Sequence, residues 1–215
     1  MTDSTTKVRE HYSAMGLTGR IKSALATIVP DGQPLTVDEL APLDQFHIRG
    51  MLATSELASA AGVEPSTQVL DIGCGIGGPA RSLPAIFGCN VTAIDLSPAF
   101  IDAANYLTSR CGLSSRITFQ VGNALHLPFE DSVFDVLFLQ HVAMSIQDRG
   151  TLYREAARGL RPGGRFAHLR LGYSAGRCRV SRSLGTRCFD QLSGERARYA
   201  RFTGTSGILS TSLAR

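Results

Sequence analysis

An apolar segment, Gln68 to Ile72, runs directly into the glycine-rich segment Gly73 to Gly78, and this junction constrains the fold more than any other feature of the chain. Gly73, Gly75 and Gly78 have the spacing G-x-G-x-x-G between a predicted strand and a predicted helix. Glycine permits a sharp turn and the close approach of a ligand, and N–H groups at a helix start can face polar groups of that ligand. The pattern predicts a nucleotide-type binding loop, although a tight turn without a ligand has the same pattern.

Short apolar segments and helical patterns alternate along the chain. After the strand at 68–72 we expect strands at 91–94, 117–121, 134–139 and 165–167, with helices between them. Such alternation forms right-handed crossovers and a parallel sheet. The predicted fold class is α/β, a doubly wound, mostly parallel Rossmann-like sheet. Ligands of such sheets bind beyond the carboxyl ends of the strands, where the strand order reverses.

The pattern also divides the chain into three parts. Residues 1–62 are expected to be a helical N-terminal segment, with helices over 8–28 and 51–61, and residues 43–47 packed over the site entrance as a lid. The second helix is expected to turn Leu52, Leu57 and Ala61 inward. Residues 63–167 form the binding domain, and residues 168–215 form an atypical tail rich in Arg, Ser and Gly.

Two residues are predicted to begin helices. Ser97 is followed by Pro98, which is the arrangement of a capping residue and a proline at the first helical position. Asp148 precedes a helical pattern that aligns Leu152, Ala156 and Leu160.

Two carboxylates near the glycine loop help to distinguish between the candidate ligands. Asp95 ends the strand after the loop, where a carboxylate can accept both ribose hydroxyls of a nucleotide; capping a helix is its other interpretation. These features fit NAD and S-adenosylmethionine equally. Asp71 lies two residues before the first glycine, where it would repel a pyrophosphate but could hold the ammonium of a methionine moiety.

Several segments together resemble one enzyme family. The segment Val69-Leu70-Asp71-Ile72-Gly73-Cys74-Gly75-Ile76-Gly77 resembles motif I of class I S-adenosylmethionine-dependent methyltransferases, and Leu160-Arg161-Pro162-Gly163-Gly164-Arg165 resembles their turn before strand five. The spacing of Asp95, of residues 122–124 and of residues 134–136 matches too. The resemblance covers about residues 40–167 and is closest to the small-molecule branch that includes ubiquinone/menaquinone-biosynthesis and glycine or sarcosine methylating enzymes.

The resemblance implies S-adenosylmethionine as the cofactor and assigns contacts to it. Motif I supplies the methionine end of the site, Asp95 and Leu96 the ribose contacts, and Asn123 and Ala124 the adenine contacts. Many relatives have Asp at the position of Asn123, and the carbonyl oxygen of Asn can still accept from the adenine amine. The full set of expected cofactor contacts is Asp71, Gly73, Cys74, Gly75, Gly77, Asp95, Leu96, Asn123, Ala124 and Gln140.

Three residues are candidates for the methyl-acceptor pocket. His141 follows strand four and could act as a base or a hydrogen-bond anchor, or simply begin a helix. Tyr12, which we assign a catalytic role, and His47, which we assign to the substrate, come from the segment that covers the pocket in similar enzymes; packing or surface roles remain open for both. Methyl transfer from a sulfonium mainly needs alignment, and a base only where the nucleophile must lose a proton. No metal is required, and His126, Glu130 and Asp131 do not form a convincing ligand set.

Composition excludes several classes of protein. The 215 residues are 43% hydrophobic, without the run of roughly 20 apolar residues that spans a bilayer, and residues 1–7 lack export character. We therefore expect a cytoplasmic protein without a membrane partner. Five cysteines, none in a C-x-x-C pair, argue against a disulfide framework and a zinc site.

The tail differs from the rest of the chain in charge. Residues 1–167 carry a formal net charge of −3 and residues 168–215 carry +7. A nucleic-acid-binding tail is one interpretation, but lysine and regular aromatic spacing are lacking. We prefer a shifted reading frame starting near Ala167-His168, because codons for His168-Leu169-Arg170-Leu171, read one base later, can spell IYDL, a normal strand-five ending of the family. The closing C-terminal strands would then be missing, which predicts an unpaired strand edge, low stability and weak or no activity. Sequencing of the gene tests this.

Three functions remain open at this point. The leading prediction is methyl transfer from S-adenosylmethionine to the N, O or C nucleophile of a small molecule, by a chain that the shifted frame would make a truncated copy. The alternatives are an NAD-dependent oxidoreductase and a non-enzymatic remnant or nucleic-acid binder using the basic tail.

Overall fold

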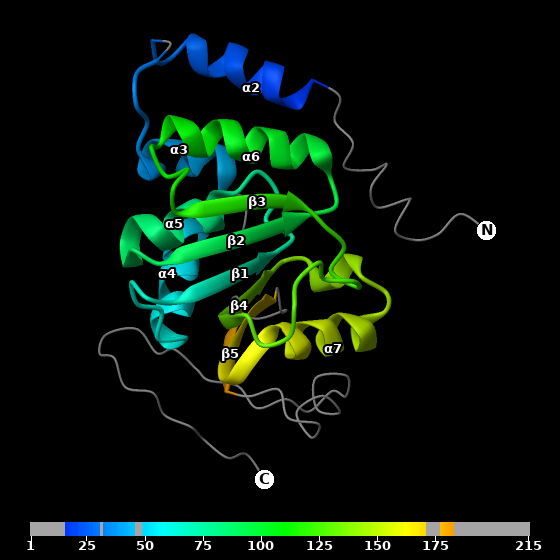
Figure 1. The fold of residues 1–215 in the computed structure, drawn as a ribbon. Coiled ribbons are helices and arrows are strands. Elements are labelled where there is room, and N and C mark those ends of the chain that lie inside the picture. The colour runs from blue at the N-terminus through cyan, green and yellow to red at the C-terminus, as the bar shows by residue number, and fades with distance from the viewer. Residues whose placement is uncertain (1–15, 31, 46–48, 171–176, 183–215) are drawn as a thin grey trace, which may run out of the picture.

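A central sheet lies in the middle of the fold, with helices around it (Figure 1). The computed structural model describes residues 16–30, 32–45, 49–170 and 177–182. The strands are β1 (Gln68–Ile72), β2 (Asn90–Asp95), β3 (Ile117–Val121), β4 (Phe134–Gln140), β5 (Leu160–Arg170) and β6 (Arg177–Arg182). Their order is β3-β2-β1-β4-β5-β6, with the first five parallel, so the predicted doubly wound α/β fold is confirmed.

Helices cover both faces of the sheet. Apolar residues of α4 (Gly50–Ala60), α5 (Gly78–Phe87) and α6 (Pro98–Arg110) share one buried cluster with residues of the sheet, while α7 (Arg149–Gly159) packs on the opposite face. Outside α6 lies α2 (Leu17–Ala26), which is the top layer in Figure 1. A helix α3 (Val37–Asp44) reaches α5, and a short 3-10 helix η1 (Ala143–Ser145) follows β4.

The helix starts follow from local hydrogen bonding. The Ser97 hydroxyl accepts from the Phe100 N–H at the start of α6, and the Asp148 carboxylate accepts from the Thr151 N–H at the start of α7, as predicted. Helix α3 begins with a capping box between Thr36 and Glu39, which the sequence analysis did not anticipate.

The inward-facing set predicted for α4 is partly wrong. Leu57 and Ala61 are fully buried, but Leu52 is 58% exposed. Thr54, two residues further along, faces the sheet instead and is fully buried. Leu52 and Thr54 are about 200° apart around a helix, so both cannot face inward.

The strand at the end of the domain is longer than predicted and has a neighbour. Strand β5 begins at Leu160, with a register irregularity opposite Phe134, and continues to Arg170. Strand β6 pairs with it antiparallel, from Arg165 opposite Arg182 to Arg170 opposite Arg177. The expectation that the edge of β5 lacks a partner is therefore wrong, since β6 supplies its backbone hydrogen bonds. The shifted-frame hypothesis itself stays a prediction, because most of residues 168–215 lie outside the described part of the chain.

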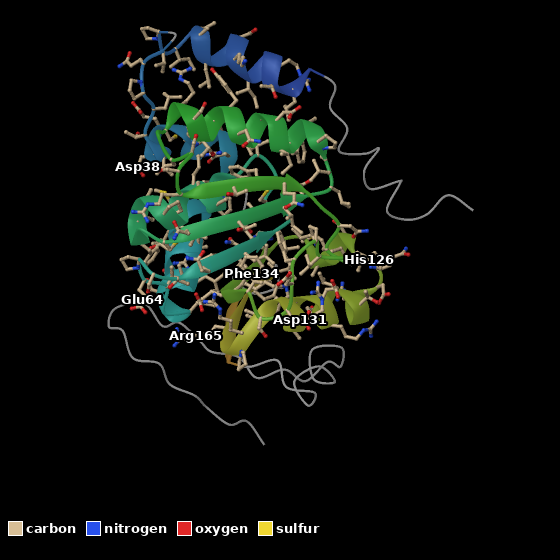
Figure 2. All side chains as sticks on the ribbon, in the orientation of Figure 1. Asp38, Glu64, His126, Asp131, Phe134 and Arg165 are labelled. Atoms are coloured by element: carbon tan, nitrogen blue, oxygen red, sulfur yellow. The ribbon has the colours of Figure 1, made fainter. Side chains whose placement is uncertain are left out.

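The carboxyl ends of the five parallel strands lie on the same side of the sheet. Figure 2 shows Glu64 and Arg165 on the side where the strands begin and His126 on the side where they end. Any site for a ligand is expected on that second side, between β1 and β4, where the order of the strands reverses. Within the described residues, no helix combines the length and apolar character needed to cross a membrane.

Candidate functional site

The glycine loop between β1 and α5 is held by its own backbone. The N–H groups of Gly73 and Cys74 both donate to the carbonyl oxygen of Ile94, at 2.8 and 3.0 Å, and the Gly77 N–H donates to the Cys74 carbonyl oxygen at 2.9 Å. The fourth predicted contact residue, Gly75, donates its N–H to a carboxylate oxygen of Asp95 at 3.0 Å. These four N–H groups therefore have protein partners, and the expected contacts of the loop with a cofactor stay a prediction.

This arrangement bears directly on the type of ligand. A loop that binds pyrophosphate offers several free N–H donors to the phosphate oxygens. Here four donors of the loop are occupied by protein oxygens, one of them a carboxylate. These four donors are therefore not available to a phosphate, and the Asp95 carboxylate beside Gly75 would repel one.

Asp95 joins the loop to the strand beside it. One of its carboxylate oxygens accepts from the Gly75 N–H, and the other accepts from the Ser97 N–H at 2.9 Å. A carboxylate has about four acceptor positions, so these two bonds leave capacity for ribose hydroxyls. Burial raises the pKa of Asp95, an effect that its bonds to backbone N–H groups oppose.

Asp71 lies beneath the loop with one carboxylate oxygen unsatisfied. It is 2% exposed, and its Oδ2 atom has no hydrogen-bond partner among the residues that the structure describes. Burial, with a smaller contribution from the negative charge of Asp95, raises the pKa of Asp71 to about 7. A buried oxygen acceptor without a donor is costly, so the site is better satisfied when a cationic donor binds.

The glycines of the loop differ in the space around them. A Cβ atom on Gly73 would lie 2.3 Å from Cγ2 of Val142, the residue that precedes η1. A Cβ atom on Gly75 would meet nothing within 4 Å. Both residues have positive φ angles, 75° and 55°, which favour glycine. The open space of the loop is therefore at Gly75, next to the carboxylate of Asp95.

Gln140 ends β4 and carries a second unsatisfied group. It is 7% exposed, and its Oε1 atom accepts from the Thr54 hydroxyl at 3.2 Å. Its Nε2 atom has no hydrogen-bond partner in the described ranges. Because side chains alternate along a strand and Asp71 pairs with Phe138, Asp71 and Gln140 face the same side of the sheet.

His141, the predicted acceptor-side residue, follows directly. It has a positive φ of 56°, which is uncommon for a residue with a side chain, and its N–H donates to the Leu169 carbonyl oxygen at 3.3 Å. Such backbone strain marks a position that the surrounding structure holds in place. The two residues expected to join it, Tyr12 and His47, lie outside the described residues.

The predicted adenine contacts lie beside Asp95. The Gly122 N–H donates to the Asp95 carbonyl oxygen at 2.9 Å, which brings Asn123 and Ala124 to the same edge as Leu96. Oδ1 of Asn123 accepts from the Leu125 N–H at 2.9 Å, so one of its two lone pairs is used locally. Ala124 is 8% exposed and packs in the cluster under α7, so it can offer a ligand mainly its backbone.

The sequence analysis missed a buried ion pair behind the loop. Arg81 of α5 and Asp44 of α3 have fully buried side chains joined at 2.5 Å. A Cβ atom on Gly78, the first residue of α5, would lie 2.3 Å from the Asp44 carbonyl oxygen. Asp44 and Gln45 thus pack on α5 behind the loop, and the covering of the site entrance by residues 43–47 stays a prediction. The one available signal was an arginine between buried Ala80 and Leu83, but the sequence does not identify its partner.

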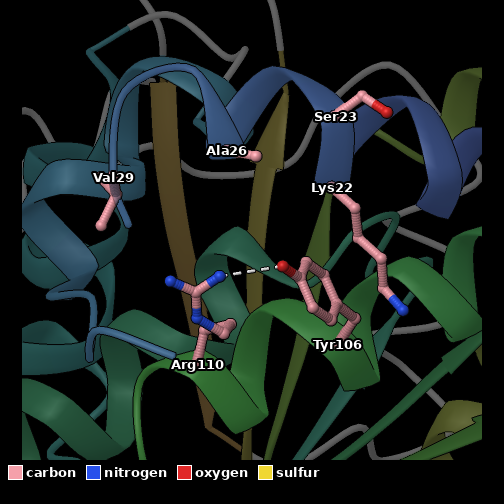
Figure 3. Close-up of a pocket in the computed structure, with 6 residues that line it drawn as sticks. All are labelled: Lys22, Ser23, Ala26, Val29, Tyr106 and Arg110. Carbon is pink, nitrogen blue, oxygen red and sulfur yellow. Dashed lines mark hydrogen bonds between the residues drawn. The ribbon is translucent and has the colours of Figure 1, made fainter. Parts of the chain in front are cut away.

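A separate cavity lies away from these groups. Its volume is about 330 Å³, and it is lined by Lys22, Ser23, Ala26, Val29, Tyr106 and Arg110 (Figure 3). Arg110 donates to the Tyr106 hydroxyl at 2.9 Å, and the ammonium of Lys22 lies 4.8 Å from the centre of the Tyr106 ring. The cavity lies between α2 and α6 and includes none of the loop residues. In the part of the chain that is described, no group of three or more His, Cys, Asp or Glu residues could hold a metal ion.

Known proteins resemble the segment that carries this site. Residues 70–168 match a family model described as a methyltransferase domain. The chain is 34% identical over 110 residues to the sterol 24-C-methyltransferase of Schizosaccharomyces pombe, a match that covers 51% of the chain and 29% of that protein. It is 35% identical over 130 residues to the 27-O-demethylrifamycin SV methyltransferase of Amycolatopsis mediterranei, covering 60% of the chain and 47% of that protein.

A solved structure agrees with these sequence matches. A geranyl diphosphate methyltransferase in complex with S-adenosylmethionine superposes with a TM-score of 0.53 at 27% identity, over 56% of this chain and 48% of that one. In all three comparisons the chain spans less than half the length of its relative.

Proposed function

Because residues 70–168 are a methyltransferase domain of the class I S-adenosylmethionine-dependent family, we propose that this chain transfers a methyl group from that cofactor to a small-molecule acceptor. The unsatisfied Oδ2 atom of buried Asp71, below a loop with occupied N–H groups, is the observation that carries this proposal. It favours a cationic ligand and disfavours NAD. In this assignment residues 63–167 bind the cofactor and residues 1–62 cover it, while residues 168–215 have no assigned role.

The unsatisfied groups fit the methionine end of the cofactor. Asp71 offers an acceptor for the ammonium, and Gln140, oriented by the Thr54 hydroxyl, offers an amide donor for the carboxylate. The open space at Gly75 receives the part of the cofactor next to the ribose, whose hydroxyls bind Asp95 beside Leu96. Asn123 and Ala124 flank the adenine. Gly73, Cys74 and Gly77 act through close backbone approach, since their N–H groups are occupied.

The chain's contribution to the reaction is alignment. The bound cofactor supplies a methyl group already activated by its sulfonium. Asp71 and Asp95 place negative charge around that cation, and His141 lies at the acceptor side, where it accepts a proton or anchors the acceptor by a hydrogen bond. Tyr12 and His47 complete the acceptor pocket in this proposal. We further propose a cytoplasmic location.

Binding calorimetry tests the cofactor assignment. The full chain should bind S-adenosylmethionine and S-adenosylhomocysteine, but not NAD. Asp71→Asn and Gln140→Leu should each weaken S-adenosylhomocysteine about tenfold and leave 5′-methylthioadenosine, which lacks the amino-acid group, within twofold. Glu130→Gln, at an exposed carboxylate outside the site, is the control. Tight binding of NAD, or equal loss for both adenosine ligands, would contradict the assignment.

Transfer of a labelled methyl group tests the reaction itself. Labelled cofactor is incubated with panels of sterols, phenolic hydroxyls, amines and prenyl compounds, and the product is identified by mass spectrometry. His141→Ala should lower turnover about a hundredfold for an acceptor that loses a proton, while cofactor affinity changes little. If the protein binds the cofactor and methylates no small molecule, the proposed activity fails although the site assignment stands.

A further inference from the structure

Arg81 has a larger set of partners than a structural ion pair needs. Its guanidinium is fully buried and donates to Asp44 Oδ2 at 2.5 Å and to the Ile76 carbonyl oxygen at 2.8 Å through one nitrogen. The other terminal nitrogen donates to the Thr108 hydroxyl at 3.1 Å and to the Ala104 carbonyl oxygen at 3.3 Å. One side chain therefore joins α3, the glycine loop, α5 and α6.

The ion pair does not satisfy all of its own polar atoms. Asp44 Oδ1 and Arg81 Nε have no hydrogen-bond partner among the described residues. A buried pair that leaves polar atoms unsatisfied contributes little net stability compared with apolar residues of the same size. Stability alone therefore does not account for a charged pair at this place.

The end of α3 is seated directly on the start of α5. The Asp44 carbonyl oxygen occupies the place where a side chain on Gly78 would stand, and Gln45 Nε2 donates to the Ser82 hydroxyl at 2.9 Å. Gly78 and Ser82 belong to the first turns of the helix that begins at the loop. Asp44 and the Ile76 carbonyl oxygen are thus linked through a single guanidinium nitrogen.

We propose that Arg81 is a positioning residue that couples the docking of α3 to the conformation of the cofactor loop. With Asp44 in place, the guanidinium holds the Ile76 carbonyl and keeps the loop in the form that leaves Gly75 open. When α3 is displaced, the buried guanidinium loses its counter-charge and the loop loses its restraint. The cofactor therefore binds tightly only to the chain with α3 docked, and it in turn stabilises that docking. This inference rests on the proposed function, because the loop must bind the cofactor.

The experiment combines ligand affinity with hydrogen exchange in the full chain. In the wild type, S-adenosylhomocysteine should slow amide exchange in the loop (73–78) and at the end of α3 (40–45). Asp44→Asn keeps the shape of the side chain but removes its charge. It should weaken the ligand about tenfold and abolish the ligand-induced protection at the end of α3.

Two further variants separate coupling from simple destabilisation. Thr108→Val removes an Arg81 bond that does not involve α3 or the loop, so it should lower the urea midpoint and leave ligand affinity within twofold. Ser82→Ala removes a partly buried contact of Gln45 without leaving a buried charge, so it stays informative if Asp44→Asn does not fold; we expect a loss of about threefold in affinity and reduced protection of α3.

The outcomes distinguish this inference from the function on which it rests. Unchanged affinity and unchanged protection of α3 in both Asp44→Asn and Ser82→Ala would overturn the coupling, while the cofactor assignment would stand. Equal losses of affinity in Thr108→Val and Asp44→Asn would also overturn it, since stability alone would then explain both. A wild-type chain that does not bind S-adenosylhomocysteine would contradict the proposed function instead.

Discussion

Gly73 and Val142 lie in direct contact at the boundary between the glycine loop and the segment after β4. The Cγ2 atom of Val142 comes within 2.3 Å of the position that a Cβ atom on Gly73 would occupy, and the φ angle of Gly73 is 75°. The contact joins the end of β1 to the segment after β4, the two strands between which the sheet reverses its order. Glycine is required here by a neighbouring side chain as well as by backbone conformation.

Replacing Gly73 by Ala should therefore cost more than backbone strain. Gly163→Ala is the matched control, because Gly163 has a φ of 81° and nothing lies within 4 Å of its Cβ position. The control should lose about 1 kcal/mol of unfolding free energy, and Gly73→Ala about 2–4 kcal/mol. Urea denaturation measures both. Adding Val142→Ala should restore part of the loss in Gly73→Ala; no restoration would show that the contact is not the cause.

Gly75→Ala should separate ligand binding from stability. Its φ of 55° resembles the 67° of Gly112, and neither Cβ position has a neighbour within 4 Å. Gly75→Ala and Gly112→Ala should therefore lose similar unfolding free energy, about 1 kcal/mol. Only Gly75→Ala should weaken S-adenosylhomocysteine, by tenfold or more, because its methyl group enters the proposed cofactor space. Equal affinities of the two variants would place the cofactor elsewhere.

The buried carboxyl of Asp71 should make the unliganded protein less stable as pH rises. Its pKa is raised to about 7 in the folded chain, from an ordinary value of 3.8, mainly by burial. Between these values the folded state retains a proton that the unfolded state has lost, so stability falls with increasing pH and levels off above pH 7. The loss is of the order of a few kcal/mol. Urea midpoints at pH 5 and pH 8 should differ less in Asp71→Asn than in the wild type.

Cofactor affinity should change with pH in the opposite direction. The ionised form of Asp71 is the one that holds an ammonium, so affinity for S-adenosylhomocysteine should rise as pH increases through about 7. At pH 6.5 binding should release a proton, which calorimetry detects as a heat that depends on the ionisation enthalpy of the buffer. Asp71→Asn should bind more weakly, with no such dependence. A wild-type heat that is the same in phosphate and Tris buffers would contradict this assignment.

The alternation of apolar segments and helical patterns along the chain predicted most of the fold. The alternation of buried strands and helices predicted the parallel sheet, and Ser97 and Asp148 marked two helix starts correctly, because capping depends on residues only three apart. The facing of α4 and the start of β5 were less predictable. Whether Leu52 or Thr54 faces the core depends on the residues that each one contacts in the folded chain. Strand β5 extends through a proline and two glycines, which normally interrupt a strand.

The candidate site, too, could be predicted only in part from the sequence. The glycine loop and the carboxylates Asp71 and Asp95 could be predicted from the sequence, because each lies at a fixed offset from the end of a strand. The folded structure was needed to show that the loop N–H groups are occupied, that Asp71 and Gln140 each keep an unsatisfied atom, and that Arg81 pairs with Asp44, 37 residues earlier in the chain. Hydrogen-bond partners distant in sequence depend on how helices pack over the sheet, and that packing has no local pattern from which it can be read.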